Sequence, residues 1–205
     1  MPADRRVVAV CATGLEAWGV RRRAPGIRVI QVGVGGSAPA GDAWVVISAG
    51  VCGGLLPDQV PGTVVIATSV SDQSGATHAC DPAVADRLEH AARTLGMRVV
   101  TGSLVSTPAM VTGPARALWA GRGHVAVDME SAAAAADAAA FGVVRVILDS
   151  PQRELSPAWA APRRAVLDPA NWIDAIWLAI HAPGYALRVG AILQAAFLGD
   201  VDAQV

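Results

Sequence analysis

Seven short runs of apolar, β-branched residues, each bounded by glycine, proline or aspartate, place the strongest constraint on how this chain can fold. Most of the runs are apolar throughout, which is typical of strands buried on both faces of a sheet. Alanine-rich stretches with helical character separate them. The runs are Val7–Ala12, Ile27–Val32, Trp44–Ser48, Thr63–Ser69, Arg98–Val105, His124–Val127 and Val143–Leu148. This alternation predicts one α/β domain that spans residues 1–205.

Three further regions have helical patterns. Pro82–Leu95 begins with proline after Asp81, a residue type that caps helices, and the alanines of Met129–Ala140 have a high helix propensity. From Trp172 to Leu198, apolar residues at helical spacing lie on both sides of Pro183-Gly184, which predicts two amphipathic helices. Charged residues and this break argue against a membrane-spanning segment. We expect both helices to pack on the sheet or across a dimer contact, with a membrane-surface role as the alternative.

The composition excludes several classes of protein. With 16 Lys+Arg and 17 Asp+Glu the formal net charge is -1, so the chain lacks the basic excess of a nucleic-acid-binding protein. No lysine occurs, which excludes a Schiff-base lysine and the lysine of a P-loop. Cys11, Cys52 and Cys80 form no metal-binding or disulfide pattern. We therefore expect no metal site and a reducing, cytoplasmic location.

Glycine-rich segments follow two of the predicted strands. Residues 32–36 read VGVGG, and residues 49–54 read AGVCGG. Neither segment matches the GxGxxG pattern, so we expect no dinucleotide cofactor. Successive backbone N–H groups in such segments can bind an anion, and glycine lets a ligand approach the backbone closely. Tight turns at the strand ends explain the same glycines equally well.

Three acidic residues lie at the ends of predicted strands. Asp128 and Glu130 flank Met129 at a strand-to-helix junction, where the helix dipole alone could stabilise their charge. A carboxylate can accept hydrogen bonds from both hydroxyls of a ribose, so Glu130 is a candidate sugar-binding residue, with Met129 packing on an apolar ring. Asp149 ends the apolar run Val143–Leu148. Burial there would raise its pKa and let it protonate a leaving group, whereas capping of the following turn is the alternative.

The order of these segments resembles the nucleoside phosphorylase/nucleosidase superfamily, which includes purine and uridine phosphorylases, methylthioadenosine/S-adenosylhomocysteine nucleosidase and futalosine hydrolase. The resemblance covers about residues 7 to 150. Its blocks are Ala12-Thr13-Gly14, Gly33-Val34-Gly35, Ser48–Leu55, Val127–Ser131 and Val144–Asp149. It implies a central mixed, twisted sheet flanked by helices. It also implies cleavage of the N-glycosidic bond of a purine nucleoside without a cofactor, with phosphate as a co-substrate if the enzyme is a phosphorylase.

The resemblance assigns roles to individual residues. Asp149 would protonate or hydrogen-bond N7 of a purine, so that the base leaves neutral from a transition state that resembles an oxocarbenium ion. Glu130 would bind the ribose hydroxyls and Met129 would pack on the sugar. The remaining implied contacts are Ala109 and Met110 with the base, Asp128, Gly50 and Val51 with the substrate, and Gly14 and Gly35 with phosphate.

The chain departs from the family pattern at several positions. Val51 replaces a frequent serine, and Leu148 replaces the serine or asparagine that usually precedes the catalytic aspartate. Nucleosidases position the attacking water with a glutamate on the first loop. Glu16 is the nearest candidate, although an alignment shifted by two residues places Trp18 there. Phosphorylases use arginines instead, and the candidates are Arg21–Arg23, Arg28 and Arg145. The sequence therefore leaves open whether water or phosphate is the nucleophile, and whether the chain is active.

Within the superfamily, the Thr13-Gly14-Leu15 segment, Val51 and the apolar C-terminal region are most similar to the hopanoid-associated phosphorylases. That resemblance implies an adenosyl-lipid such as adenosylhopane as substrate. We expect a homodimer or higher oligomer. The alternatives are a nucleosidase of the methylthioadenosine/S-adenosylhomocysteine or futalosine type, a non-catalytic nucleoside-binding protein with the same fold, and a peripheral membrane protein.

Overall fold

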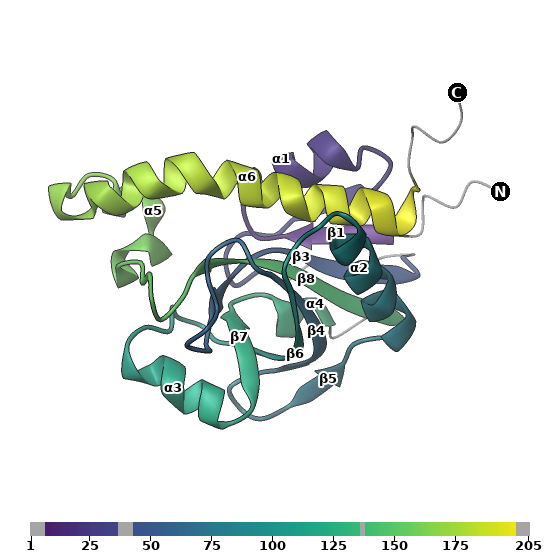
Figure 1. Cartoon of the computed structure of the whole chain (residues 1–205), viewed down its shortest axis with the longest axis horizontal. Helices are drawn as coiled ribbons and strands as arrows, with labels where there is room; N and C mark the ends of the chain where they lie inside the picture. The colour runs from purple at the N-terminus through teal and green to yellow at the C-terminus, as the bar shows by residue number, and fades with distance from the viewer. Residues whose placement is uncertain (1–6, 37–42, 136–137, 200–205) are drawn as a thin grey trace.

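A computed structural model describes residues 7–36, 43–135 and 138–199, and an eight-stranded sheet forms its centre. The strands are β1 (Val7–Cys11), β2 (Arg28–Gln31), β3 (Val45–Gly54), β4 (Val64–Ser71), β5 (Thr77–Ala79), β6 (Val99–Ser106), β7 (His124–Asp128) and β8 (Ala140–Asp149). Strand β3 is parallel to β1 and β8 and antiparallel to β7. Strand β8 also pairs antiparallel with β4. The predicted α/β fold with a mixed sheet and flanking helices is confirmed (Figure 1).

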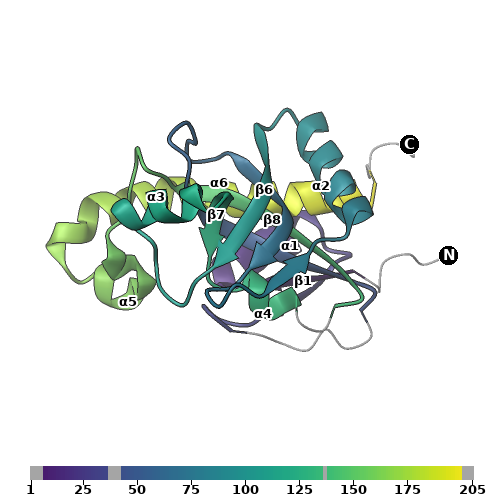
Figure 2. The same ribbon diagram turned by 90° about the horizontal axis from the view of Figure 1, so that it is seen from below.

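Six α-helices lie in the described part of the chain, together with short 3-10 turns at Pro157–Ala160 and Pro169–Asn171. The helices are α1 (Gly14–Arg23), α2 (Pro82–Thr94), α3 (Pro114–Gly121), α4 (Ser131–Ala135), α5 (Pro162–Ala165) and α6 (Trp172–Phe197). In Figure 1, α6 runs across the top of the sheet with α2 near its C-terminal end. Viewed from below, α6 lies behind the strands (Figure 2). The sheet and α6 together form the frame that carries the candidate site.

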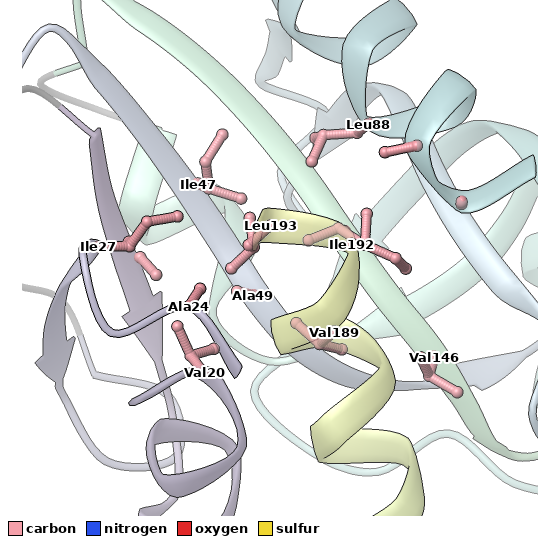
Figure 3. Close-up of a cluster of buried hydrophobic side chains, with 14 of the residues drawn as sticks. Val20, Ala24, Ile27, Ile47, Ala49, Leu88, Val146, Val189, Ile192 and Leu193 are labelled. Carbon is pink, nitrogen blue, oxygen red and sulfur yellow. The ribbon is translucent and has the colours of Figure 1, made fainter. Parts of the chain in front are cut away.

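The C-terminal half of α6 belongs to the hydrophobic core. Ile192 and Leu193 are fully buried in one cluster with Val20 of α1 and Leu88 of α2, as Figure 3 shows. Helices α1 and α6 cross closely because Gly19 has no side chain: a Cβ there would overlap the Ala186 backbone. The expectation that the apolar C-terminal region packs on the sheet therefore holds for this half of the helix.

The prediction of two C-terminal helices is wrong, because α6 is continuous and contains Pro183. A proline inside a helix removes one hydrogen bond and costs about 3 kcal/mol. Burial of the half of α6 that follows Pro183 in the hydrophobic core offsets this cost. The first half of α6 projects past the strands (Figure 1) and exposes Ile173, Ile176 and Ile180 by 80%, 62% and 68%. Among the described helices, this one alone is long and apolar enough to cross a membrane, and 33% of its most apolar window is buried.

The other elements differ from the prediction in several places, and helices α1, α3 and α5 are not predicted from the sequence. Residues 49–54 do not form a turn, because β3 continues through the glycines to Gly54 and pairs with β7 and β8. Strand β5 is an element that the sequence pattern does not predict. The helix predicted at Met129–Ala140 is shorter: α4 ends at Ala135, and Ala140 already pairs with Val45 in the ladder between β8 and β3. Residues 136–137 of that predicted helix lie outside the described residues.

Candidate active site

A cavity of about 520 Å³ lies where β1, β3, β7 and β8 end, and α6 closes one side of it. This volume suits a small-molecule ligand. Eight of the residues predicted to form the site line the cavity: Glu16, Val51, Ala109, Met110, Asp128, Met129, Glu130 and Asp149. Gly14, Gly35 and Gly50 do not line it, although a chain neighbour of each one does. Trp18 is 44% exposed and lies outside the cavity, so Glu16 is the first-loop residue that reaches it.

Arg145 of β8 organises the carboxylates of this site. Its Nη2 atom lies 2.7 Å from Asp128 Oδ2 and 3.5 Å from Glu130 Oε2, and its Nη1 atom lies 3.9 Å from Glu16 Oε1. Nη2 also donates to the hydroxyl of Ser48 at 2.7 Å. Burial alone would lower the pKa of Arg145, but the three carboxylates outweigh it and raise the pKa. Arg145 is therefore permanently charged and holds the three acidic side chains in place.

Glu16 is placed by the first turn of α1. Thr13 and Glu16 form a capping box, in which the Thr13 backbone N–H donates to Glu16 Oε2 at 2.8 Å. The other oxygen, Oε1, accepts from the Val51 backbone N–H at 2.8 Å. Gly50 makes this approach possible, because a Cβ there would overlap Glu16 Oε1. The buried carboxylate of Glu16 thus joins the end of β1 to the middle of β3.

Glu130 and Met129 follow β7 and lie on the cavity wall. Glu130 Oε1 accepts from the Gly35 backbone N–H at 3.1 Å, so this glycine segment binds a side-chain carboxylate of the protein itself. Burial raises the pKa of Glu130, and the guanidinium of Arg145 opposes the rise. Asp128 accepts hydrogen bonds from two serine hydroxyls: its Oδ1 atom accepts from Ser106 Oγ at 2.5 Å, and its Oδ2 atom accepts from Ser131 Oγ. Asp128 therefore supports the site, and Glu130 borders the open space.

Asp149 ends β8 on the same cavity, separate from the Arg145 cluster. Its Oδ2 atom accepts a hydrogen bond from Nη2 of Arg116, a buried residue of α3. Burial raises the pKa of Asp149, and Arg116 limits the rise. A raised pKa favours the protonated form of Asp149, which can donate a proton to a bound ligand.

Two arginines contact the carboxylates of this site, and neither contact is predicted from the sequence. Arg145 is a candidate phosphate ligand by the family resemblance, but its partners are carboxylates and serine hydroxyls. A charged residue in the otherwise apolar run Val143–Leu148 is a signal that buried acidic partners exist. Arg116 gives no such signal, because it lies outside the predicted strands and helices. Only the tertiary structure brings it to Asp149.

The cavity is acidic and largely apolar. Glu16, Asp128, Glu130 and Asp149 line it, whereas none of its described lining residues is lysine, arginine or histidine. Arg145 and Arg116 pair with these carboxylates from outside the lining, so the surface that a ligand meets carries acidic and no basic side chains. Cys52 also lines the cavity, and burial raises the pKa of its thiol, which keeps it protonated at neutral pH. Within the described ranges, no group of three or more His, Cys, Asp or Glu side chains could hold a metal ion.

Comparison with known proteins identifies related sequences and folds. The sequence model of the phosphorylase superfamily matches residues 27–160, more than half of the chain. No curated protein is significantly similar in sequence. Many solved structures share the fold. One is a variant of the 5′-methylthioadenosine/S-adenosylhomocysteine nucleosidase (MTAN) of Helicobacter pylori with 5′-methylthioadenosine in its active site. It has 12% identity and a TM-score of 0.70, with 94% of this chain and 97% of that chain covered.

Two further solved structures share the fold at similarly low sequence identity. Futalosine hydrolase of Helicobacter pylori has 12% identity and a TM-score of 0.70, with 94% of this chain and 97% of that chain covered. The 5′-methylthioadenosine/S-adenosylhomocysteine nucleosidase of Neisseria meningitidis, in complex with methylthio-immucillin-A, has 19% identity and a TM-score of 0.68, with 95% and 99% covered. At these identities the comparison establishes the fold.

Proposed function

Because the chain belongs to the phosphorylase superfamily, we propose that it is a nucleosidase that hydrolyses the N-glycosidic bond of a purine nucleoside. One observation carries the proposal: Glu16, Glu130 and Asp149, all buried, border one cavity whose described lining holds no cationic side chain. Three carboxyl groups in three different environments can supply the three roles that this hydrolysis needs, which are acid, sugar ligand and base.

Asp149 is the acid in this mechanism. As the bond between C1′ and the base nitrogen breaks, the bonding electron pair moves to the base, and N7 takes the proton of the Asp149 carboxyl. Burial raises the pKa of Asp149, which favours the protonated form that this step requires. The ribosyl group becomes an oxocarbenium ion. The carboxylates of Glu16, Asp128 and Glu130, together with the Asp149 carboxylate that the proton transfer leaves, stabilise this positive charge.

Glu130 binds the ribose hydroxyls and Met129 packs on the sugar ring. A carboxylate can accept hydrogen bonds from both hydroxyls of a diol, so the carboxyl group of Glu130 needs to remain ionised. Arg145, 3.5 Å away, supports the ionised form. Arg145 also pairs with Asp128, so one guanidinium fixes the sugar ligand relative to the end of β7. Orientation of this kind accounts for much of the rate in reactions of bound substrates.

Water, not phosphate, is the nucleophile that this site favours. Gly14 and Gly35, which the family resemblance assigns to phosphate, lie outside the cavity lining, and the Gly35 N–H already donates to Glu130. Arg145 is surrounded by carboxylates. A phosphate dianion would therefore meet like charge without a cationic partner. Glu16 is the residue that accepts a proton from water as it attacks C1′.

Glu16→Gln tests the proposed base. The amide preserves the size of the side chain, and glutamine also functions in a capping box, so the first turn of α1 should remain. One of the two backbone N–H groups that donate to Glu16 loses its acceptor, so we expect a lower melting temperature in a folded protein. We expect kcat to fall by about 10²–10⁴, the usual contribution of a general base. Base release under single-turnover conditions and the melting temperature are the two measurements. A kcat within about threefold of the wild type, in a variant that is folded at the assay temperature, would remove Glu16 from the mechanism.

The apolar side of the cavity favours a substrate with an apolar 5′ substituent. Leu178, Ala179, Ala182 and Pro183 of α6 line it, beside Trp159. These side chains offer apolar contact and no charge to a substituent on the sugar. An alkylthio group, as in 5′-methylthioadenosine, or the hydrocarbon of an adenosyl-lipid such as adenosylhopane meets this requirement. We include both in the proposal, in place of a nucleotide with a charged 5′ phosphate.

A panel of nucleosides tests the proposed function. Adenosine, inosine, 5′-methylthioadenosine and an adenosyl-lipid are incubated with the protein, and the free base is measured by chromatography. We expect base release, fastest from substrates with an apolar 5′ group. Binding of a nucleoside by calorimetry without release of its base would instead support a non-catalytic binding protein. Rates that do not depend on the 5′ group would contradict the proposed substrate class.

A further inference from the structure

Arg116 reaches Asp149 from behind the cavity and does not line the cavity itself. Its side chain is buried, with Nη2 donating to Asp149 Oδ2 and Nη1 donating to the Gly54 carbonyl at 2.5 Å. Its Nε atom lies 3.0 Å from Glu154 Oε1. Glu154 Oε1 in turn accepts from the Gly113 backbone N–H, which precedes α3, at 2.8 Å. Arg116 is therefore fixed by contacts on both sides.

This geometry determines which oxygen of Asp149 can carry the proton. An arginine N–H needs a lone pair on its acceptor, and Arg116 always donates because it remains charged. Protonation of Asp149 at Oδ2 would weaken that hydrogen bond. The proton is therefore directed to Oδ1. Arg116 also stabilises the carboxylate that remains after the proton has left.

We propose that Arg116 is the positioning residue that makes Asp149 an effective acid, and that the charge of Glu154 partly offsets the effect of Arg116 on Asp149. The proposal rests on the function proposed above for Asp149. When the base takes the proton from Oδ1, the new carboxylate is already paired with the guanidinium, so the products of the transfer are stabilised without reorganisation. Arg116 touches neither substrate nor reacting atoms and acts only through Asp149.

Two charged groups act on Asp149, and they act in opposite directions. Arg116, from α3, lowers its pKa, and Glu154, from the segment after β8, raises it. The nearby thiol of Cys52, on β3, is neutral because burial raises its pKa. Removal of each charge in turn should therefore shift the titration of Asp149 with opposite signs.

Arg116→Met and Glu154→Gln form the test, with Arg116→Lys as the conservative variant. Base release needs protonated Asp149, so kcat falls as the pH rises through its pKa. In Arg116→Met we expect this alkaline limb to move up by about one pH unit or more, and the plateau rate to fall at least about tenfold. In Glu154→Gln the limb should move down. Arg116→Lys should keep the limb close to that of the wild type, because the charge remains.

The carboxyl ¹³C resonance of Asp149, assigned by its loss in Asp149→Asn, gives a second readout that needs no turnover. If the wild type releases no base, the proposed function fails, yet the opposite shifts of the Asp149 titration in the two variants would still establish the pairing. Arg93→Met removes a surface charge that pairs with Glu89, and it serves as the control. An unshifted alkaline limb and an unshifted resonance in Arg116→Met and Glu154→Gln would reduce Arg116 to a structural role and overturn the proposal.

Discussion

Asp149→Asn is expected to lower base release by about 10²–10⁴, because the amide cannot donate the proton that the leaving base requires. The fold should persist, since the amide oxygen can still accept the hydrogen bond from Arg116. The measurement is kcat for the best substrate of the nucleoside panel, together with the Kd of that substrate, which should change by less than about tenfold. The loss should therefore appear in kcat.

Asp58→Asn is the matched control, because Asp58 is exposed and lies outside the cavity. This variant should retain the wild-type rate. Near-normal turnover in Asp149→Asn, with the control unchanged, would mean that the leaving base is protonated by another group or by solvent. The assignment of Asp149 as the acid would then be wrong.

Glu130→Gln is expected to cause the second large loss, and the loss should depend on the sugar. A hydrogen bond to a charged partner contributes about 1.5–3 kcal/mol, so kcat/KM for a ribonucleoside should fall about 10- to 100-fold. A 2′- or 3′-deoxynucleoside lacks one of the hydroxyls, so its kcat/KM should fall much less in Glu130→Gln. Comparison of the two substrates in wild type and variant forms a cycle that isolates the contact between Glu130 and the diol.

The second expectation for Glu130→Gln concerns the stability of the fold. The substitution removes one carboxylate from the group around Arg145, but Asp128 and Glu16 remain as partners of the guanidinium, so the fold should stay intact. An equal loss for the ribonucleoside and the deoxynucleoside would argue against a direct contact with the sugar. Glu130 would then act only by orienting Arg145.

The centre of the sheet is largely predictable from the sequence because β1, β3, β4 and β8 are buried along most of their length. Runs such as Val143–Leu148 have few other ways to satisfy their apolar side chains. The errors occur where tertiary contacts override local preference. Glycines at 49–54 suggest a turn, yet β3 continues there because it pairs with β7 and β8, and the glycine at position 50 leaves room for Glu16. Pro183 suggests a helix end, yet α6 continues through it because the residues that follow pack in the core.

The site is predictable to the extent that its residues follow strand ends. Glu130 and Asp149 each come directly after a strand or end one, and the structure brings both to one cavity. The partner of Asp149 could not be found in this way. Arg116 is 33 residues from Asp149 in sequence, and a single arginine in a short amphipathic helix has no pattern that reveals an ion pair. Contacts of this kind depend on the whole fold.

The dependence of base release on phosphate tests the hydrolytic mechanism most directly. Wild-type protein, freed of phosphate by dialysis, is incubated with the best substrate over a series of phosphate concentrations. The free base is measured by chromatography, and phosphorus NMR detects any sugar phosphate. If water attacks C1′ with Glu16 as the base, the free base and the free sugar form at a rate that phosphate does not increase. Release of base only when phosphate is present, with formation of a sugar 1-phosphate, would contradict the mechanism and identify a phosphorylase.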